Sequence, residues 1–572
     1  MSKFPYGFSF ELIFTHCTMK QDGIDCFVTQ THSGEYRGRV FRTGTGETVG
    51  KEVRFGTEQK EVETMNLNDL IEIEQLKYCY EQAYALHRHT EIPDMFVQEA
   101  DTVFTLPSAG DRTVGWDVIN EKFCHELYYV SPNEDSFHTG WQICTPFLWE
   151  GEEGEIKGIF PTFGFLVLSM DPTTMKPPYP VLSTLELWQD HFARREGRWR
   201  IHYLEAQFLL GQCVWKWNAP EDKMLAVQKK LREIPHPVLN PEGICLDSAA
   251  GPGASGRDPI RPYMGVGAGL YGVQFAQSLY TLLWQCGRMD EIPDFVFSNA
   301  DEVSVWYDEE EICTGQNEVR LFFRKMKEKT LNNGGFFRID MPATQWIEVS
   351  DDGQSAAGHW LTMSRQIDRS ESGNQYRVRI GLFSNTFRRE GGVWKFVSVR
   401  WEKLQDFAPY DETPDMNLEN YRKDPAGWLT DLPVLKPVSR EEGDGRAEEI
   451  LVLRNKILSW FHAVNTGKTA ADVFPCGTEE VREDLQEMLR DVRYILATSP
   501  VFWMDEGLTK AEGFFSVSLL TDTEEDEMTN VRGSVGMTLT RTEYGWEIRR
   551  FSWYPYAALD SWKKDGEAAL LA

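Results

Sequence analysis

Hydrophobic residues follow two different periods along this chain. In residues 70–87, Ile73, Leu76, Tyr80 and Ala83 recur every three or four positions, which is the spacing of one helix face. Segments in which apolar and polar residues alternate come next, as in half-buried strands, and a Gly-Trp pair marks a hairpin near their end. Short alternating runs also occur in the first 60 residues, at 8–14, 24–31 and 36–42. Together these patterns predict an α+β fold.

The chain also repeats itself. Residues 91–104 and 291–304 are identical at seven of fourteen positions without a gap, at an offset of 200 residues. A fixed offset indicates a duplicated structural unit. A weaker third copy follows, because a helical pattern returns at 454–465. The closing strand pattern occurs three times, at 188–206, 383–401 and 537–553.

Two stretches of different composition separate the copies. Residues 235–262 are rich in Pro, Gly and Ser, and residues 408–446 carry Pro and charge without periodicity, which is typical of linkers. A chain of 572 residues is also long enough for about three or four domains. We therefore expect a β-rich N-terminal extension at 1–60, three related domains at 61–218, 263–407 and 447–560, and linkers at 219–262 and 408–446.

Charge and composition exclude several classes of partner. The 59 Lys and Arg residues against 89 Asp and Glu residues leave a formal net charge of −30, which repels phosphate backbones and anionic lipid. Neither nucleic acid nor a membrane is therefore an expected partner. The ten cysteines are scattered singly and no apolar run reaches about 18 residues, so we expect a cytoplasmic protein. No zinc-ligand spacing, phosphate loop or dinucleotide fingerprint occurs, so we expect no cofactor and no metal.

One series of motifs in the first copy points to a known superfamily. A helix with Gln-Leu-Lys and a tyrosine is followed by a loop ending in Ala-Asp and by a glycine turn into a second helix, at 118–127. A histidine then precedes long strands, and the series closes with Asp-x-Phe-x-Arg and Gly-x-Trp-x-Ile. This series resembles the nuclear transport factor 2-like superfamily and, more narrowly, its SnoaL-like polyketide cyclase and dehydratase branch. The matching positions are Gln75, Leu76, Lys77, Tyr80, Ala100, Asp101, Gly115, Ile119, His138, Gly158, Asp190, Phe192, Arg194, Gly197, Trp199 and Ile201.

The resemblance implies that each copy is a cone-shaped domain, in which helices pack on a strongly curved antiparallel sheet and leave a deep pocket. The superfamily includes dehydratases, isomerases, cyclases and epoxide hydrolases, and also proteins without catalysis, so the fold does not decide the function. Some relatives are trimers and others are dimers. We therefore expect the fused copies to form an intramolecular pseudo-trimer or pseudo-dimer, and either arrangement leaves further homo-oligomerisation open.

Histidines concentrate in the first copy, which holds six of the eleven, and His is the side chain best suited to proton transfer near neutral pH. The resemblance implies that His138 starts a strand, points into the cone and acts as general base. It also matches Tyr80 with a pocket tyrosine that donates a hydrogen bond. The acid usual in the branch lies five residues beyond that tyrosine, where this chain has Ala85. The candidate replacements are Asp101, Asp190 and Glu205.

The same copy is rich in tryptophan, and its expected pocket is aromatic. The candidate substrate-binding residues are Trp116, Trp141, Trp188 and His202. Each polar candidate also has a structural interpretation. Tyr80 can be a core residue whose hydroxyl binds a backbone carbonyl, and Asp190 can be a satisfied buried acid or part of the pocket lining.

Two functions remain open from the sequence. The first is a cofactor-independent lyase or isomerase with dehydratase-like acid–base chemistry, acting on a hydrophobic oxygenated small molecule such as a steroid, polyketide or phenolic. His138 and Tyr80 would act on the substrate, with Asp190 or Asp101 orienting them. The alternative is a binding or assembly protein built from three inert cones.

Overall fold

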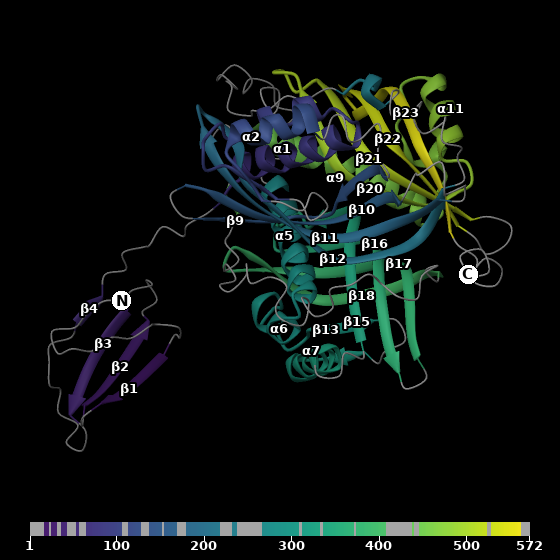
Figure 1. Ribbon diagram of the computed structural model, residues 1–572. Helices are drawn as coiled ribbons and strands as arrows, with labels where there is room; N and C mark the ends of the chain where they lie inside the picture. Colours follow the sequence, from purple (N-terminus) through teal and green to yellow (C-terminus); the bar gives the residue numbers. More distant parts are fainter. Residues whose placement is uncertain are drawn as a thin grey trace. The chain divides into compact units, whose positions relative to one another are not determined.

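The chain folds into two compact units, residues 1–64 and 65–572, and a computed structural model gives the structure of both (Figure 1). The structure describes residues 16–21, 24–30, 36–42, 53–55, 65–105, 112–126, 136–151, 154–168, 179–217, 231–236, 266–307, 312–331, 336–370, 373–407, 438–439, 445–522 and 528–561.

The first unit contains a small antiparallel sheet of four strands, in the order β1-β2-β3-β4. Two of the strands expected from alternation are present, at 24–30 and 36–42, whereas the expected strand at 8–14 lies outside the described residues. The strands are β1 (His16–Gln21), β2 (Ile24–Gln30), β3 (Tyr36–Arg42) and β4 (Val53–Phe55).

The second unit is α+β, and the same order of elements occurs in it three times. A long helix is followed by shorter helices and then by four long antiparallel strands. We refer to these parts as the first segment (residues 65–217), the second segment (266–407) and the third segment (445–561). The domain boundaries expected from the sequence stay a prediction.

The helices include those that the sequence predicts. The pattern at 70–87 corresponds to α1 (Leu67–Ala85), and the second helical pattern, at 118–127, falls on α2 (Trp116–Glu121) and the π-helical turn that continues it (Lys122–Glu126). The other helices are α5 (Val266–Gln285), α6 (Ile292–Phe295), α7 (Gln316–Leu331), α9 (Gly445–Asn465), α10 (Ala470–Val473) and α11 (Glu479–Met488).

The long strands form two sheets. One has eleven strands and joins the first and third segments through β12 and β23, with Trp215 opposite Ser561. The other has six strands and belongs to the second segment. The strands of the first segment are β5 (Met65–Asn66), β6 (Val103–Thr105), β7 (Thr113–Val114), β8 (Ser136–Ile143), β9 (Phe147–Glu150), β10 (Ile156–Leu168), β11 (Tyr179–Arg195) and β12 (Arg198–Trp217). The remaining strands are β13 (Ser304–Tyr307), β14 (Cys313–Thr314), β15 (Phe336–Val349), β16 (Ser355–Ser370), β17 (Gly373–Glu390), β18 (Val393–Phe407), β19 (Val438–Ser439), β20 (Val492–Met504), β21 (Lys510–Asp522), β22 (Met528–Thr542) and β23 (Gly545–Ser561).

Each long helix packs against strands of two segments. Helix α1 contacts β8 and also β20, α9 contacts β20 and also β15, and α5 contacts β15 and also β9. Each long helix therefore packs both on its own segment and on a neighbouring one. Helix α1 is enclosed on almost all sides in this way, and even its polar residues Glu74, Lys77 and Glu81 are buried.

The three long helices end in the same way, which aligns the segments. In each, a backbone N–H beyond the helix donates to the carbonyl of the residue five positions earlier, which lies in the last turn. The residue just before this N–H donor has a positive φ. The positive-φ residues are His87 (54°), Gly287 (69°) and Gly467 (88°). Counting back ten residues from them makes Lys77, Gln277 and Ile457 equivalent.

The closing hairpins align the strands as well. Their last paired residues are Arg195 with Arg198, Glu390 with Val393 and Thr542 with Gly545. Counting back five residues from the first member of each pair makes Asp190, Asn385 and Met537 equivalent. Strand pairing supports this equivalence, because Asp190 lies opposite Gly158 and Asn385 lies opposite Gly358.

Candidate active site

A buried ion pair lies between α1 and the sheet of the first segment. Lys77 Nζ is 2.6 Å from Asp190 Oδ2, and both side chains are 0% exposed. Lys77 reaches the interior because it shares the helix face of Ile73 and Tyr80. The sequence analysis named Asp190 as a candidate but assigned no site role to Lys77, although its position on an apolar helix face was the available signal.

Aromatic rings surround the ammonium group. Lys77 Nζ is 4.3 Å from the ring centroid of Trp188, 4.7 Å from that of Tyr80 and 5.4 Å from that of Phe160. The negative faces of such rings attract a cation. They also exclude water, so burial lowers the pKa of Lys77 and raises the pKa of Asp190 to about 6, while the attraction within the pair opposes both shifts.

A second buried carboxylate holds the tryptophans of this interior. Glu186 accepts hydrogen bonds from Thr184 Oγ1 (2.7 Å), Trp188 Nε1 (2.8 Å) and Trp141 Nε1 (3.3 Å). Burial raises the pKa of Glu186, and these bonds, which favour the charged form, oppose the rise. The structure thus places two predicted substrate-binding residues, Trp141 and Trp188, around an acid that the sequence analysis did not name.

Tyr80 lies in the same interior, with its ring edge-on to three others. The centroid distances are 5.8 Å to Trp188, 6.1 Å to Phe96 and 6.5 Å to Phe123. Within the described residues its buried hydroxyl has no hydrogen-bond partner, so the carbonyl contact expected for a core tyrosine is not found there. Burial raises the pKa of Tyr80 well above its usual value, and the hydroxyl therefore stays protonated and can donate.

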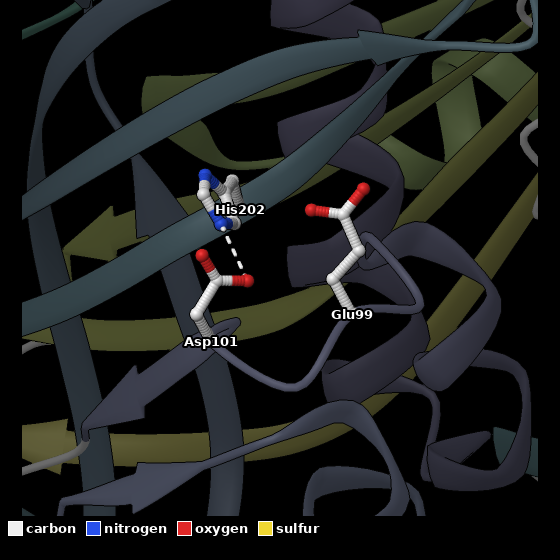
Figure 2. Close-up of side chains that lie close together, drawn as sticks. All are labelled: Glu99, Asp101 and His202. Carbon is white, nitrogen blue, oxygen red and sulfur yellow. Dashed lines mark ion pairs between the residues drawn. The ribbon is translucent and has the colours of Figure 1, made fainter.

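Two other predicted site residues meet elsewhere, on a more exposed part of the first segment (Figure 2). Asp101 Oδ1 is 3.4 Å from His202 Nε2, and their side chains are 75% and 20% exposed. Trp116 is partly buried and donates from Nε1 to the carbonyl of Pro93 at 3.1 Å. In the described structure Asp101 is thus paired with His202, whereas Asp190 and Glu186 are the buried acids near Tyr80 and Lys77.

The predicted general base His138 lies in β8, where its backbone pairs with Leu166. In the second segment Arg338 pairs with Gln366 in the same way, in agreement with the gap-free offset of 200 between the two. The side chain of His138 lies outside the described residues, so its role stays a prediction.

A groove is present in the third segment, between α11 and the sheet. Its volume is about 690 Å³. Both signs of charge occur in its lining, which includes Asp484, Glu487, Arg490, Arg550, Trp553 and Tyr554. In the part of the chain that the structure describes, every helix is too short or too polar to cross a membrane.

No family model and no curated protein matches the sequence. Among solved structures, the hexachlorocyclohexane dehydrochlorinase LinA-type3 from Novosphingobium barchaimii is 13% identical, with 25% of this chain and 90% of that chain covered and a TM-score of 0.21. A nuclear transport factor 2-like protein with a cystatin-like fold from Novosphingobium aromaticivorans is 14% identical, with coverages of 24% and 81% and a TM-score of 0.19.

Proposed function

We propose that the first segment is a cofactor-independent lyase or isomerase that acts on a hydrophobic oxygenated small molecule, such as a steroid, polyketide or phenolic. The observation that carries the proposal is the aromatic interior around Lys77, Asp190 and Tyr80. Buried titratable groups with shifted pKa values, held close together, are typical of acid–base sites.

The proposed chemistry is an elimination beside a carbonyl group. His138 takes the proton on the carbon next to the carbonyl, and the electron pair moves to the carbonyl oxygen. Tyr80 donates a hydrogen bond to that oxygen, and the ammonium group of Lys77 stabilises its negative charge in an environment of low dielectric. The electron pair then returns to form the double bond as the leaving hydroxyl departs, and the protonated His138 gives the hydroxyl the proton it took, so that water leaves and the histidine is neutral again. Asp190, 2.6 Å from Lys77, is the positioning residue for the ammonium group.

Mass spectrometry of purified protein incubated with hydroxylated steroids, polyketide-like aromatics and phenolics tests this function. We expect one class to lose water or to rearrange, and this conversion to stop in His138→Ala and Tyr80→Phe. The matched control is Tyr280→Phe, because Tyr280 is the equivalent residue of the second segment and is bonded there to Tyr307. Conversion that survives both first-segment changes would contradict the proposal.

A second candidate, a binding or assembly protein, is favoured by the complete burial of Lys77 and Asp190. Such burial is also expected of a polar group that serves only to specify packing. This candidate predicts that a ligand is retained without conversion, equally by the wild type and by His138→Ala.

We also propose that residues 61–218, 263–407 and 447–560 are three domains of the SnoaL-like branch, arranged as an intramolecular pseudo-trimer. The long helices support this arrangement, because Gln274 Nε2 of α5 donates to Glu74 Oε1 of α1 at 2.8 Å, and Arg454 of α9 is ion-paired with the same carboxylate. Limited proteolysis of two single variants tests it. We expect Glu74→Gln and Arg454→Met, each made alone, to lower the stability of all three parts together in limited proteolysis, whereas independent domains would be affected separately.

A further inference from the structure

Three metal-ligand side chains converge on the more exposed part of the first segment, away from the ion pair. One ligand atom each of Glu99, Asp101 and His202 lies within 4.8 Å of the others. Figure 2 shows the three side chains close together. One pair of these atoms, His202 Nε2 and Asp101 Oδ1, is 3.4 Å apart. In a tetrahedral zinc site with bonds of about 2.0–2.2 Å, neighbouring ligand atoms are about 3.4 Å apart. Two of the three atoms therefore already have the spacing of zinc ligands.

The backbone holds these side chains in place. His202 is the extra residue of a β-bulge in β12, since His191 pairs with Tyr203 and the next residue, Phe192, pairs with Ile201. Bulges redirect a side chain out of the regular alternation of a strand. The loop that carries Glu99 and Asp101 is fixed beside it, because β6 pairs with β12 immediately afterwards and the Trp116 amide donates to the Glu99 carbonyl at 3.0 Å.

The imidazole is also oriented as a metal ligand. Its Nδ1 is 3.4 Å from Glu155 Oε1, while Nε2 is a buried atom on the side of Asp101, 3.4 Å from Oδ1. A carboxylate at the second ring nitrogen is the usual partner of a metal-bound histidine, because it directs the lone pair of the other nitrogen towards the metal.

The charge around the cluster matches a divalent ion. Glu99, Asp101 and Glu155 bring three carboxylates, and Arg195 brings one guanidinium, which bonds both oxygens of Glu99 at 2.7 and 3.2 Å. Carboxylates thus outnumber the guanidinium among these groups. Glu99 can keep one bond to Arg195 and offer its other oxygen to a metal.

We propose that Glu99, Asp101 and His202 bind one divalent transition-metal ion of the zinc class, with Glu155 orienting His202. One imidazole and two carboxylates favour such an ion over Mg²⁺ or Ca²⁺, which prefer oxygen ligands. Neither the acid–base chemistry nor the pseudo-trimer is needed for this site. The sequence predicted no metal site, because the ligands are separated by about a hundred residues and follow no zinc spacing.

The equivalent bulges of the other segments provide controls. Their extra residues are Val397 in β18 and Arg549 in β23, which cannot replace the imidazole at neutral pH. Asp301 of the second segment corresponds to Asp101 at the offset of 200 and is also exposed, so Asp301→Asn is a matched control variant.

Isothermal titration of the chelator-treated full chain with Zn²⁺, and absorption spectra with Co²⁺, test the site. We expect one Zn²⁺ per chain, loss of that binding in His202→Gln, at least tenfold weaker binding in Asp101→Asn, and affinity reduced by about 10–100-fold in Glu155→Gln. Asp301→Asn should bind as the wild type does. Because the Asp101 side chain is 75% exposed, its variant should fold normally. A wild type that binds no Zn²⁺ one-to-one, or binding unchanged in both His202→Gln and Asp101→Asn, would overturn the proposal.

Discussion

The first and second segments hold the same two positions together by different chemistry. In the first, Lys77 and Asp190 form a buried ion pair at 2.6 Å. In the second, the equivalent residues are neutral, and Asn385 Nδ2 donates to Gln277 Oε1 at 2.8 Å. The third segment has Ile457 and Met537 at these positions, and both are buried.

The fold forms with either a charged or a neutral pair of residues at these positions. Burying two charges costs several kcal/mol per ion before their attraction repays it, whereas an amide pair avoids most of that cost. Since the second and third segments form the same elements without the charges, the Lys77–Asp190 pair is not a requirement of the fold. Its presence in the histidine-rich first segment is consistent with a functional role.

The largest expected effect comes from breaking the ion pair on one side. Asp190→Leu leaves the ammonium group of Lys77 buried without its partner, and we expect a loss of about 3–5 kcal/mol in the free energy of unfolding, measured by urea denaturation. The double variant Lys77→Met with Asp190→Leu should recover most of it. Asn385→Leu is the control in the second segment, with an expected loss of about 1–3 kcal/mol. Equal losses in the free energy of unfolding for Asp190→Leu and Asn385→Leu would show that the charged pair of the first segment and the neutral pair of the second contribute alike.

The next effect depends on pH and concerns Glu81 of α1, whose counterpart in the second segment is the uncharged Thr281. Burial raises the pKa of Glu81 from 4.5 to about 8, although Ser516 Oγ donates to the carboxyl group at 3.2 Å. The folded state therefore binds more protons than the unfolded state between these values, and stability falls as the pH rises through them. The upper limit is about 1.4 kcal/mol per pH unit.

Glu81→Gln keeps a neutral side chain of the same shape and should abolish this fall. The urea concentration at the midpoint of unfolding, measured at pH 5, 7 and 9, should rise for the variant relative to the wild type as the pH rises. Thr281→Val should show a difference from the wild type that does not change with pH. A constant difference for Glu81→Gln as well would show that this carboxyl group titrates normally.

A smaller effect on stability is expected from adding a methyl group in the interior of the second segment. Gly381 occupies the position equivalent to Glu186, and a Cβ atom added there would lie 2.3 Å from the Trp401 ring. We expect Gly381→Ala to lose about 1–3 kcal/mol through overpacking, measured by thermal and urea unfolding. Gly536→Ala is the control, because its nearest contact would be 3.6 Å. Similar small effects in both would mean that Trp401 moves easily and that the second interior has spare room.

The smallest effect tests the helix ends that align the segments. Gly467 has a φ of 88°, and an added Cβ would meet nothing within 4 Å, so Gly467→Ala should cost only the roughly 1–2 kcal/mol of a left-handed conformation. Gly445 is equally unobstructed but has no positive φ, so Gly445→Ala should be neutral or slightly stabilising. Thermal unfolding measures both. Equal outcomes would show that the end of α9 relaxes instead of keeping the shared geometry.

Much of the local structure was predictable from the sequence. The helix at 70–87, the later strands and the equivalence of Asp190 with Asn385 all follow from periodicity and offset, and strand pairing reproduces the match of His138 with Arg338. These features depend on residues near in sequence or on a repeated unit. The candidate site was predicted only in part, since Tyr80, Asp190, Trp141 and Trp188 were named whereas Lys77 and Glu186 were not.

The missed residues share a physical cause. Lys77, Glu186 and Glu99 are charged, and the sequence pattern of a charged residue normally indicates a solvent-exposed face. Lys77 is instead paired with Asp190 and Glu99 with Arg195, both far away in the chain. Glu186 is bonded by Trp141 and by its strand neighbours Thr184 and Trp188. The opposite error concerns Asp101, whose motif resembles a pocket acid although its side chain is 75% exposed beside His202.

Periodicity and repetition are properties of the chain, so they were enough to predict the α+β elements, the threefold recurrence and the richness of the first copy in histidine and tryptophan. Which charges are buried depends on the packing of the whole molecule, since α1 is enclosed by strands of two segments and its polar residues must find partners there. Pairing across hundreds of residues depends on how the segments pack against one another, and no local pattern records that.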